Sequence, residues 1–341
     1  MSAAYPLETP FTRQAHIEVP IIGGAMYPCG NPELVAAVSE AGGIGIVQPI
    51  SLTYVHGHQY REGLQYIKRL TKKPVGMNAL IEQSSKMYHE RMVKWVEIAL
   101  EEGIRFFVTS LGNPRWVVER VSREGGVVYH DVTERKWAQK GLDGGVHGLI
   151  AVNDRAGGHA GPKSAEQLLA ELGDLGVPLI CAGGVGDAAE FVRAMQMGYA
   201  GVQIGTRFIA TPECRASEAY KRAIVESDAS RIVLTERITG VPVSVIRTPV
   251  IERMGLKAGP IARWMLRGRK TKHWMRTIYA LKSLRSLKRA SLDEKAEYWQ
   301  AGKSVDGIEK IEPVAVIIRR FAGALEGAGD RGQGAGNDRG Q

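Results

Sequence analysis

The sequence has few cysteines and no long apolar run. Its three cysteines, Cys29, Cys181 and Cys214, are odd in number and widely spaced, which argues against a disulfide framework and a metal knuckle. No stretch reaches the ~20 apolar residues that a membrane helix needs. Residues 1–10 lack both a basic start and an apolar core, so we expect no signal peptide. These absences predict a soluble protein of a reducing, cytoplasmic compartment.

One segment lacks acidic residues altogether. Residues 256–290 hold 11 lysines and arginines and no aspartate or glutamate, and subtracting them from the net charge of +9 leaves −2 for the rest. The chain is therefore not generally basic, and we expect no nucleic-acid partner. The segment is either a patch for acidic lipid, a nucleotide tail or a carrier protein, or a solvated helical face near a homodimer contact. We favour the solvated face.

Short apolar runs recur along the 341 residues, and each ends in small or polar residues. They are almost continuously hydrophobic, as strands buried on both faces should be. The runs are 20–25, 44–49, 74–79, 105–110, 127–132, 147–152, 178–183 and 201–206. Segments with helical spacing lie between them, for example 32–41, 87–102, 114–123, 164–175 and 187–197. Ser164 with Gln167 has the spacing of a capping box, and Pro32 suits a first helical turn.

Eight alternations of strand and helix are typical of a closed (β/α)₈ barrel, the TIM barrel. An open doubly wound sheet is the lesser alternative, because it usually has fewer strands. We expect the barrel to span 10–211, followed by a smaller helical domain over 212–300. A closing helix over 301–321 should pack on the barrel, and the Gly-rich tail 322–341 should be disordered.

Chemistry in such barrels lies where the strands end at their carboxyl side. The polar residues at the ends of the predicted strands include Gln48, Asn78, Ser110 and His130. After the seventh and eighth strands come two turns rich in glycine, residues 183–186 and 205–207. Because glycine lacks a Cβ atom, backbone N–H groups can approach an anion closely there, and these turns predict a phosphate site.

Residues 184–189 also fit the dinucleotide pattern G-x-G-x-x-A. That pattern requires an acidic residue at the end of the next strand, to bind the ribose. The next strand ends at residues 203–206 without an acidic residue, so we reject this interpretation.

A loop after the sixth strand, residues 156–161, carries His159 between glycines. Such glycines let a flat ring pass close to the backbone, and an imidazole that titrates near neutral pH suits proton abstraction beside it. The alternative is a loop histidine that binds a backbone carbonyl. The nearby phosphate turns favour the catalytic role. His56 and His58 have no third ligand at suitable spacing, so we expect no metal site.

A family resemblance rests on six motifs. They are residues 20–26 (PIIGGAM), 42–43 (GG), 75–78 (VGMN), 156–161 (AGGHAG), 182–184 (AGG) and 205–207 (GTR). The combination resembles the nitronate monooxygenases, a flavoprotein superfamily that includes flavin-type enoyl-ACP reductases and NAD(P)H:quinone reductases. The resemblance covers residues 10–215 closely and returns weakly at 299–304. It implies a (β/α)₈ barrel with an added helical domain and bound FMN.

The resemblance also implies roles for particular residues. His159 would be the catalytic base or the group that orients the substrate. The implied FMN-binding residues are Gly24, Ala25, Met26, Asn78, Gly158, Gly161, Gly183, Gly184, Gly205 and Thr206. Of these, the last four would hold the phosphate.

The reaction implied is oxidation of a small-molecule alkyl nitronate with O₂ to a carbonyl product and nitrite. A reductase that uses NAD(P)H on a quinone or an enoyl thioester is the alternative on the same fold. A non-catalytic binding protein is a remote third possibility.

Three residues depart from the family pattern. Asn153 replaces a usual glycine, Arg155 stands where many members carry an acidic residue, and Lys303 replaces a usual glutamine. The two added cations either favour an anionic or acyl-CoA-like substrate or form ion pairs. The departures bear on the substrate rather than on the fold.

Overall fold

The computed structural model describes residues 7–82, 86–238, 240–259, 292–293, 296 and 298–334. Residues 260–290, which form most of the basic segment, lie outside the described residues, as do residues 335–341 of the predicted tail. The uses suggested for the basic segment therefore stay predictions.

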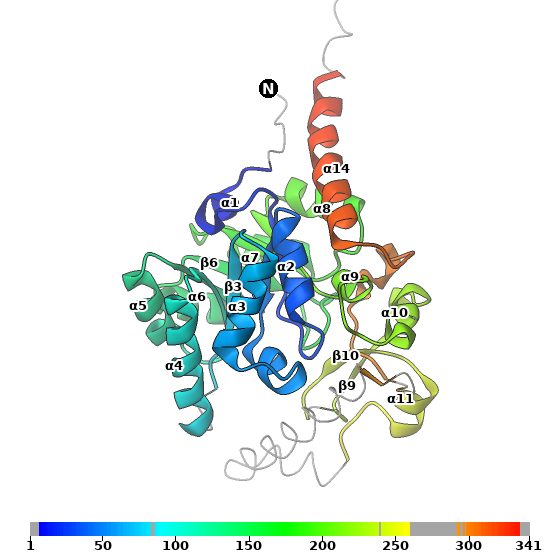
Figure 1. Cartoon of the computed structure of the whole chain (residues 1–341). Coiled ribbons are helices and arrows are strands. Elements are labelled where there is room, and N and C mark those ends of the chain that lie inside the picture. The colour runs from blue at the N-terminus through cyan, green and yellow to red at the C-terminus, as the bar shows by residue number, and fades with distance from the viewer. Residues whose placement is uncertain are drawn as a thin grey trace, which may run out of the picture.

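Eight parallel strands close into a barrel in sequence order, with β1 paired to β8 (Figure 1). The strands are β1 (Ile21–Gly23), β2 (Ile44–Val47), β3 (Val75–Leu80), β4 (Phe106–Ser110), β5 (Val127–Val132), β6 (Gly148–Val152), β7 (Leu179–Ala182) and β8 (Gly201–Ile204). Each overlaps one of the predicted apolar runs. The closed order confirms the predicted TIM barrel and excludes the open sheet.

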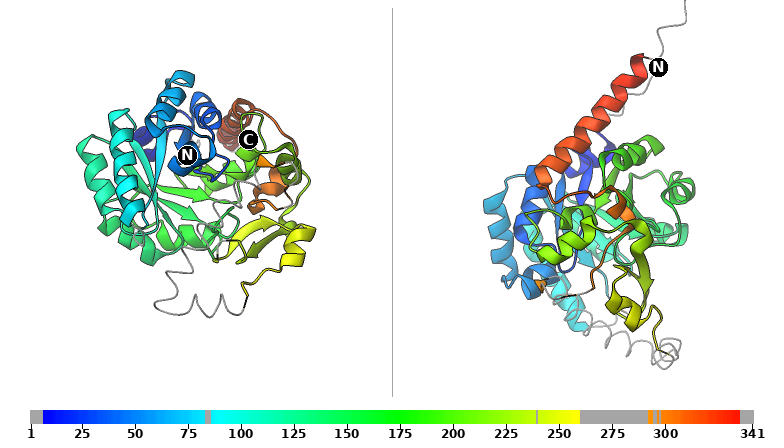
Figure 2. Two further views of the ribbon diagram at one scale, coloured as in Figure 1. Left: turned by 60° about the horizontal axis from the view of Figure 1, so that its bottom comes forward. Right: turned by 90° about the vertical axis from the view of Figure 1, so that its right-hand side faces the viewer.

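Helices surround the strands as an outer ring, which is visible in the left view of Figure 2. They are α2 (Pro32–Glu40), α3 (Tyr60–Leu70), α4 (Lys86–Glu101), α5 (Arg115–Arg123), α6 (Arg135–Asp143), α7 (Ala165–Leu172) and α8 (Ala188–Met197), with α9 (Thr206–Ile209) after β8. The predicted capping box is present, because Ser164 accepts a hydrogen bond from the backbone of Gln167. Pro32 is the first residue of α2, and Gly198 ends α8 with a φ of 109°.

The strand pleat divides the apolar side chains into an inner and an outer layer. The inner cluster fills the barrel with Ile22, Ile44, Ile46, Phe106, Val108, Tyr129, Ile150, Ile180 and Ala182. Helix α1 (Pro10–Ala15) closes one end of the barrel, where the ring of Phe11 lies 5.8 Å from Phe106 and 5.6 Å from Tyr129. The carboxyl ends of the strands therefore meet at the opposite end, which we call the mouth.

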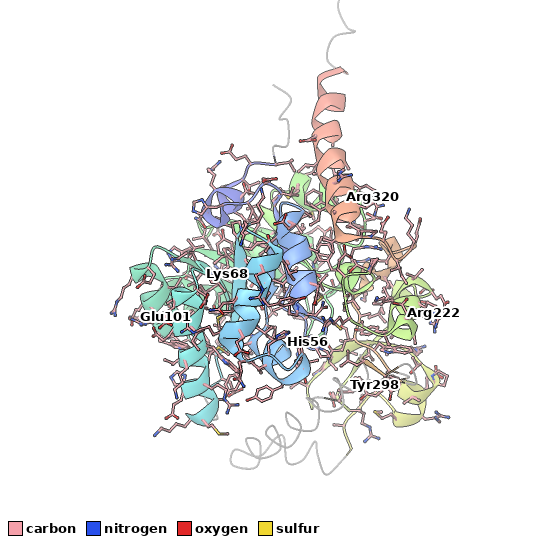
Figure 3. All side chains as sticks on the ribbon, viewed as in Figure 1. His56, Lys68, Glu101, Arg222, Tyr298 and Arg320 are labelled. Atoms are coloured by element: carbon pink, nitrogen blue, oxygen red, sulfur yellow. The ribbon has the colours of Figure 1, made fainter. Side chains whose placement is uncertain are left out.

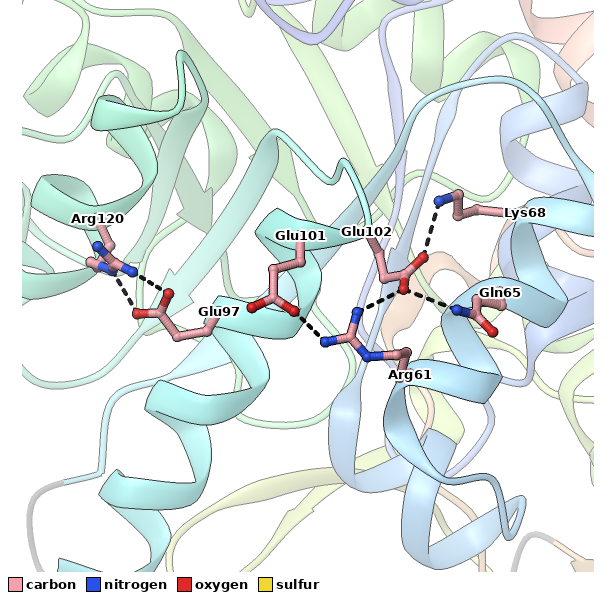
Figure 4. A network of polar contacts seen from close by, with 7 residues as sticks. All are labelled: Arg61, Gln65, Lys68, Glu97, Glu101, Glu102 and Arg120. Carbon is pink, nitrogen blue, oxygen red and sulfur yellow. Dashed lines mark hydrogen bonds and ion pairs between the residues drawn. The ribbon is translucent and has the colours of Figure 1, made fainter.

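A network of charged side chains joins three outer helices (Figure 4). The carboxylate of Glu102, just after α4, accepts hydrogen bonds from three residues of α3: Arg61, Gln65 and Lys68, at 2.9–3.1 Å. Arg120 on α5 pairs with Glu97 on α4. These bonds hold neighbouring helices in place around the barrel, away from the mouth.

The chain after the barrel contains strands as well as helices. Helix α10 (Glu218–Val225) and the short η2 (Ala229–Arg231) precede an antiparallel pair, β9 (Ile232–Thr235) and β10 (Val243–Ile246), and α11 (Pro249–Met254) follows. We expected only helices over 212–300. The β-branched runs in both strands, with Gly240 between them, explain the pair.

The last described elements are a short turn of helix, η3 (Lys303–Gly307), and α14 (Val314–Gly334). Helix α14 packs against α2 and α8, and the ring of Phe321 stacks on Phe191 at 5.6 Å. It runs past residue 322, where we expected a disordered tail to begin, because its buried face continues to Leu325. The right view of Figure 2 shows its far end projecting from the barrel. No described helix has both the length and the apolar character to cross a membrane.

Candidate active site

The predicted residues after β1 and β8 come together at the mouth. The N–H of Gly24 donates to the carbonyl of Ile204 at 2.9 Å, and a Cβ atom placed on Gly205 would lie 3.4 Å from Met26 Sδ. Ala25 packs against the inner cluster. Asn78 lies on β3 between Met77 and Ala79, whose side chains belong to the outer core. Because side chains alternate along a strand, Asn78 points into the barrel.

The turn after β7 accepts only glycine. Gly183 has a φ of +117° and Gly184 a φ of +85°, which L side chains rarely adopt. A Cβ atom on Gly183 would also clash with Oδ1 of Asn153, and one on Gly184 would lie 2.9 Å from Nε of Arg155. The absence of side chains at these two positions lets Asn153 and Arg155 pack directly against the turn.

Backbone donors in the two turns have no acceptor in the described part of the chain. Gly184, Val185 and Thr206 are buried residues, and no carbonyl or side chain of the described residues accepts from their N–H groups. A buried N–H group without a partner is costly. By contrast, the start of α8 is already capped, because Asp187 accepts from the N–H of Glu190 at 2.8 Å. The two turns can therefore bind an anion through their N–H groups.

Asn153 joins the end of β6 to the turn after β7 by hydrogen bonds. Its side-chain Nδ2 donates to the carbonyl of Gly183 at 2.9 Å, and its Oδ1 accepts from the N–H of Arg155 at 2.9 Å. The residue is 1% exposed. From the sequence, Asn153 is evident only as a departure from the family pattern. A lone amide directly after an apolar strand was the signal for this role.

The segment 299–304 packs on both turns from the far end of the sequence. The N–H of Gly302 donates to Oγ1 of Thr206 at 3.0 Å, and the N–H of Lys303 donates to the carbonyl of Arg155 at 2.9 Å. A side chain on Gly186 would clash with the carbonyl of Ser304. The weak family resemblance at 299–304 thus marks a part of the site.

The two added cations form ion pairs in this structure. Nη2 of Arg155 lies 3.2 Å from a carboxylate oxygen of Asp306, and Nζ of Lys303 lies 3.9 Å from Asp154. These contacts agree with the second interpretation of Arg155 and Lys303, that they form ion pairs within the protein. All four side chains are partly exposed.

The loop of His159 borders both turns. A Cβ atom on Gly157 would lie 3.3 Å from Oγ1 of Thr206, and the carbonyl of Gly158 accepts from the N–H of Ser244 on β10 at 2.8 Å. His159 reaches solvent, yet the protein atoms around it remove enough water to lower the pKa of its imidazole. The ring is therefore neutral at neutral pH, which is the form that accepts a proton.

The other histidines on the loop after β2 have structural contacts. Nε2 of His56 lies 3.2 Å from the carbonyl oxygen of Pro28, and burial lowers the pKa of His56 to about 4. The ring of His58 stacks on Tyr66 at 5.6 Å. Figure 3 shows His56 and Tyr298 toward the same end of the molecule, opposite Arg320. Within the described ranges, no three His, Cys, Asp or Glu side chains form a group that could hold a metal ion.

On β5, the prediction that His130 lies at the mouth is wrong. His130 points outward, where its Nδ1 lies 2.8 Å from Oγ1 of Thr109 and burial lowers its pKa to about 4. Its neighbour Asp131 shares the face of Tyr129 and points into the barrel. An acidic residue in the run 127–132 was the signal that we did not use.

Comparison with known proteins identifies relatives along most of the chain. The family model described as nitronate monooxygenase matches residues 8–322. A (3aS,4S,5R,7aS)-5-hydroxy-7a-methyl-1-oxo-octahydro-1H-indene-4-carboxyl-CoA dehydrogenase of Mycobacterium tuberculosis is 31% identical over 261 residues, which cover 75% of this chain and 70% of the relative. A probable nitronate monooxygenase of Staphylococcus saprophyticus is 28% identical, with coverage of 73% and 81%.

Solved structures agree with this assignment. FabK from Thermotoga maritima superposes with a TM-score of 0.78 at 27% identity, covering 96% of this chain and 99% of that one. A nitroalkane oxidase from Streptomyces ansochromogenes, at 21% identity, a TM-score of 0.73 and coverage of 95% and 99%, shows the shared fold alone. With a family match over residues 8–322, the chain belongs to the nitronate monooxygenase family, whose members are in general flavin-dependent, and is an oxidoreductase enzyme.

Proposed function

We propose that this protein is an FMN-dependent oxidoreductase that oxidises alkyl nitronates with O₂ to a carbonyl product and nitrite. One observation carries the proposal. Two glycine-containing turns present N–H groups without an acceptor in the described chain, directly beside the loop of His159. A flavin phosphate requires an anion-binding site, which the two turns would supply. Removal of a substrate proton requires a base, which the neutral imidazole would supply.

The residues at the mouth fit FMN. Gly183, Gly184, Gly205 and Thr206 would hold the phosphate, since buried N–H groups in these two turns need an acceptor. Ala25, Met26 and Asn78 would lie along the ring and the ribityl chain. Gly24, Gly158 and Gly161 would keep the backbone close to the cofactor. When bound, FMN supplies the electron transfer, and the protein positions the substrate relative to the flavin.

His159 would accept the α-proton of a neutral nitroalkane substrate. A neutral nitroalkane must lose its α-proton before it can be oxidised, and a neutral imidazole can accept that proton. A nitronate has already lost it. The role of His159 therefore predicts different effects on the two substrate forms.

The test compares His159→Asn with His16→Asn. His16 follows α1 at the closed end of the barrel and has a φ of 54°, which asparagine tolerates, so its variant is a matched control. We expect all three proteins to be yellow. Turnover of neutral nitroethane should collapse in His159→Asn alone, while ethylnitronate is still oxidised. Undiminished nitroethane turnover would remove His159 from the mechanism. A colourless wild-type protein that FMN cannot reconstitute would overturn the function and favour a non-catalytic binding protein.

A second candidate function has specific support from the relatives. The mycobacterial relative is named for a carboxyl-CoA substrate, and the chain covers nearly all of FabK at 27% identity. The carboxyl-CoA in the name of the mycobacterial relative favours the alternative function, a reductase or dehydrogenase that would use NAD(P)H on a thioester or a quinone. Anaerobic mixing separates the two functions. Bleaching of the flavin by ethylnitronate alone supports the monooxygenase, whereas rapid bleaching by NADH or NADPH supports the second candidate.

A further inference from the structure

Asp131 is the last side chain of β5 that points into the barrel. Its neighbours Val128 and Val132 belong to the outer core, whereas Tyr129 belongs to the inner cluster. Strand alternation therefore places Asp131 above Tyr129, one layer closer to the mouth. The strand ends one residue later, so the carboxyl group lies at the mouth end of the barrel.

Asp131 is a residue of intermediate exposure, but one oxygen of its carboxyl group lacks the contact that a buried polar atom needs. Its Oδ1 is fully buried and has no hydrogen-bond partner among the described residues. Burial raises the pKa of Asp131 to about 7, and no neighbouring charge contributes to that shift. The group therefore holds a proton over much of the range below neutral pH, and a protonated carboxyl group is a hydrogen-bond donor.

Gln48 shows what a satisfied polar residue at the mouth looks like. It follows β2, and its Oε1 accepts from the N–H of Ile50 at 2.6 Å and of Ser51 at 3.1 Å. Asp131 has no comparable contact within the described chain. A buried polar atom without a partner calls for a functional explanation.

We propose that Asp131 is a binding residue of this site, and that its carboxyl group donates a hydrogen bond to an acceptor atom of the molecule held at the mouth. The inference rests on the proposed function, because that molecule is FMN or the substrate bound beside it. Both carry uncharged or anionic oxygen and nitrogen acceptors. Asp131 thus adds a second proton-carrying group to the site, contributed by a strand rather than by the loop of His159.

The experiment compares Asp131→Ala, which removes the donor, with Asp131→Asn, which keeps a donor in nearly the same place. Asp143→Ala on the exposed end of α6 is the control for removal of an aspartate. Two quantities are measured on the full chain: the Kd for FMN, from flavin fluorescence, and the concentration of ethylnitronate that gives half-maximal anaerobic bleaching of the bound flavin.

We expect Asp131→Ala to raise one of these quantities about tenfold, the effect of one lost hydrogen bond, and Asp131→Asn to stay close to wild type. A weaker Kd identifies the flavin as the acceptor, whereas a changed nitronate concentration alone identifies the substrate. If Asp131→Ala changes neither, or Asp131→Asn is equally impaired, the inference is overturned while the proposed function stands. If the wild-type protein binds no FMN, both the inference about Asp131 and the proposed function are wrong.

Discussion

Asn153 donates a hydrogen bond from its side-chain amide to the carbonyl oxygen of Gly183, at 2.9 Å. The bond joins the end of β6 to the turn after β7, and it spans 30 positions in the sequence. The same side chain holds the N–H of Arg155, so a single amide fixes the start of the His159 loop and the glycine turn together. The geometry of the proposed phosphate site therefore depends on a side chain at the end of the preceding strand.

Asn153→Asp should weaken FMN binding without unfolding the protein. The carboxylate keeps the acceptor for Arg155 but loses the donor to Gly183, and it places a negative charge beside the proposed phosphate. We expect a loss of about 1–3 kcal/mol in unfolding free energy, because a buried carbonyl loses its partner. Urea unfolding measures this loss, and flavin retention after gel filtration measures binding. Retention equal to wild type would contradict the proposed role.

Gly183→Ala should abolish FMN retention, whereas Gly198→Ala should not. Both glycines have a positive φ, 117° and 109°, so both variants carry similar backbone strain of about 1–2 kcal/mol. A Cβ atom on Gly198 meets nothing within 4 Å, while one on Gly183 clashes with Asn153. The comparison separates the effect of backbone strain from the effect of displacing Asn153. Equal flavin loss in both variants would show that strain alone is responsible.

Asp131→Asn should stabilise the flavin-free protein above about pH 7 and have little effect near pH 4. The pKa of Asp131 is raised from 3.8 to about 7, so the folded state holds its proton more tightly than the unfolded chain does. The stabilisation that the protonated Asp131 gives the folded wild-type protein is therefore lost as the pH rises from about 4 to 7. The free energy of unfolding falls by at most ~4 kcal/mol over this range. Asparagine does not titrate and avoids that loss. Thermal unfolding across pH 4–8, with Asp143→Asn as control, checks the prediction.

Glu102→Gln should destabilise the protein at neutral pH by about 1 kcal/mol. Burial alone would raise the pKa of Glu102, but hydrogen bonds from Lys68, Arg61 and Gln65 outweigh it and hold the pKa below its usual value. This stabilisation is present above the pKa of the unfolded chain and is lost as the pH falls through the folded pKa. The difference between variant and wild type should therefore vanish in acid. Glu101→Gln, on the more exposed neighbour, should cost less.

The barrel could be predicted from the sequence because each of its strands and several of its helices carry a local signal. Apolar runs marked the strands, and Ser164 and Pro32 marked helix starts. The glycine turns were equally local. Helix α14 passed our boundary at residue 322 because its packing continues to Leu325, which the Gly-rich composition of this stretch does not reveal.

The site was less predictable because its remaining parts depend on contacts between distant segments. Which face of β5 points inward follows from barrel closure, and so Asp131 was missed in favour of His130. Asn153 acts through Gly183 on another strand. The contact of Gly302 with Thr206 joins residues 96 positions apart, which no local pattern reveals.

That contact has a consequence for how the enzyme is made. The backbone around Gly302 closes against the turns after β7 and β8, although the last barrel strand ends almost a hundred residues earlier. A nascent chain on the ribosome can therefore complete all eight strands and still lack the segment that contacts both turns. The FMN site that we propose would be complete only after residue 302 has left the exit tunnel.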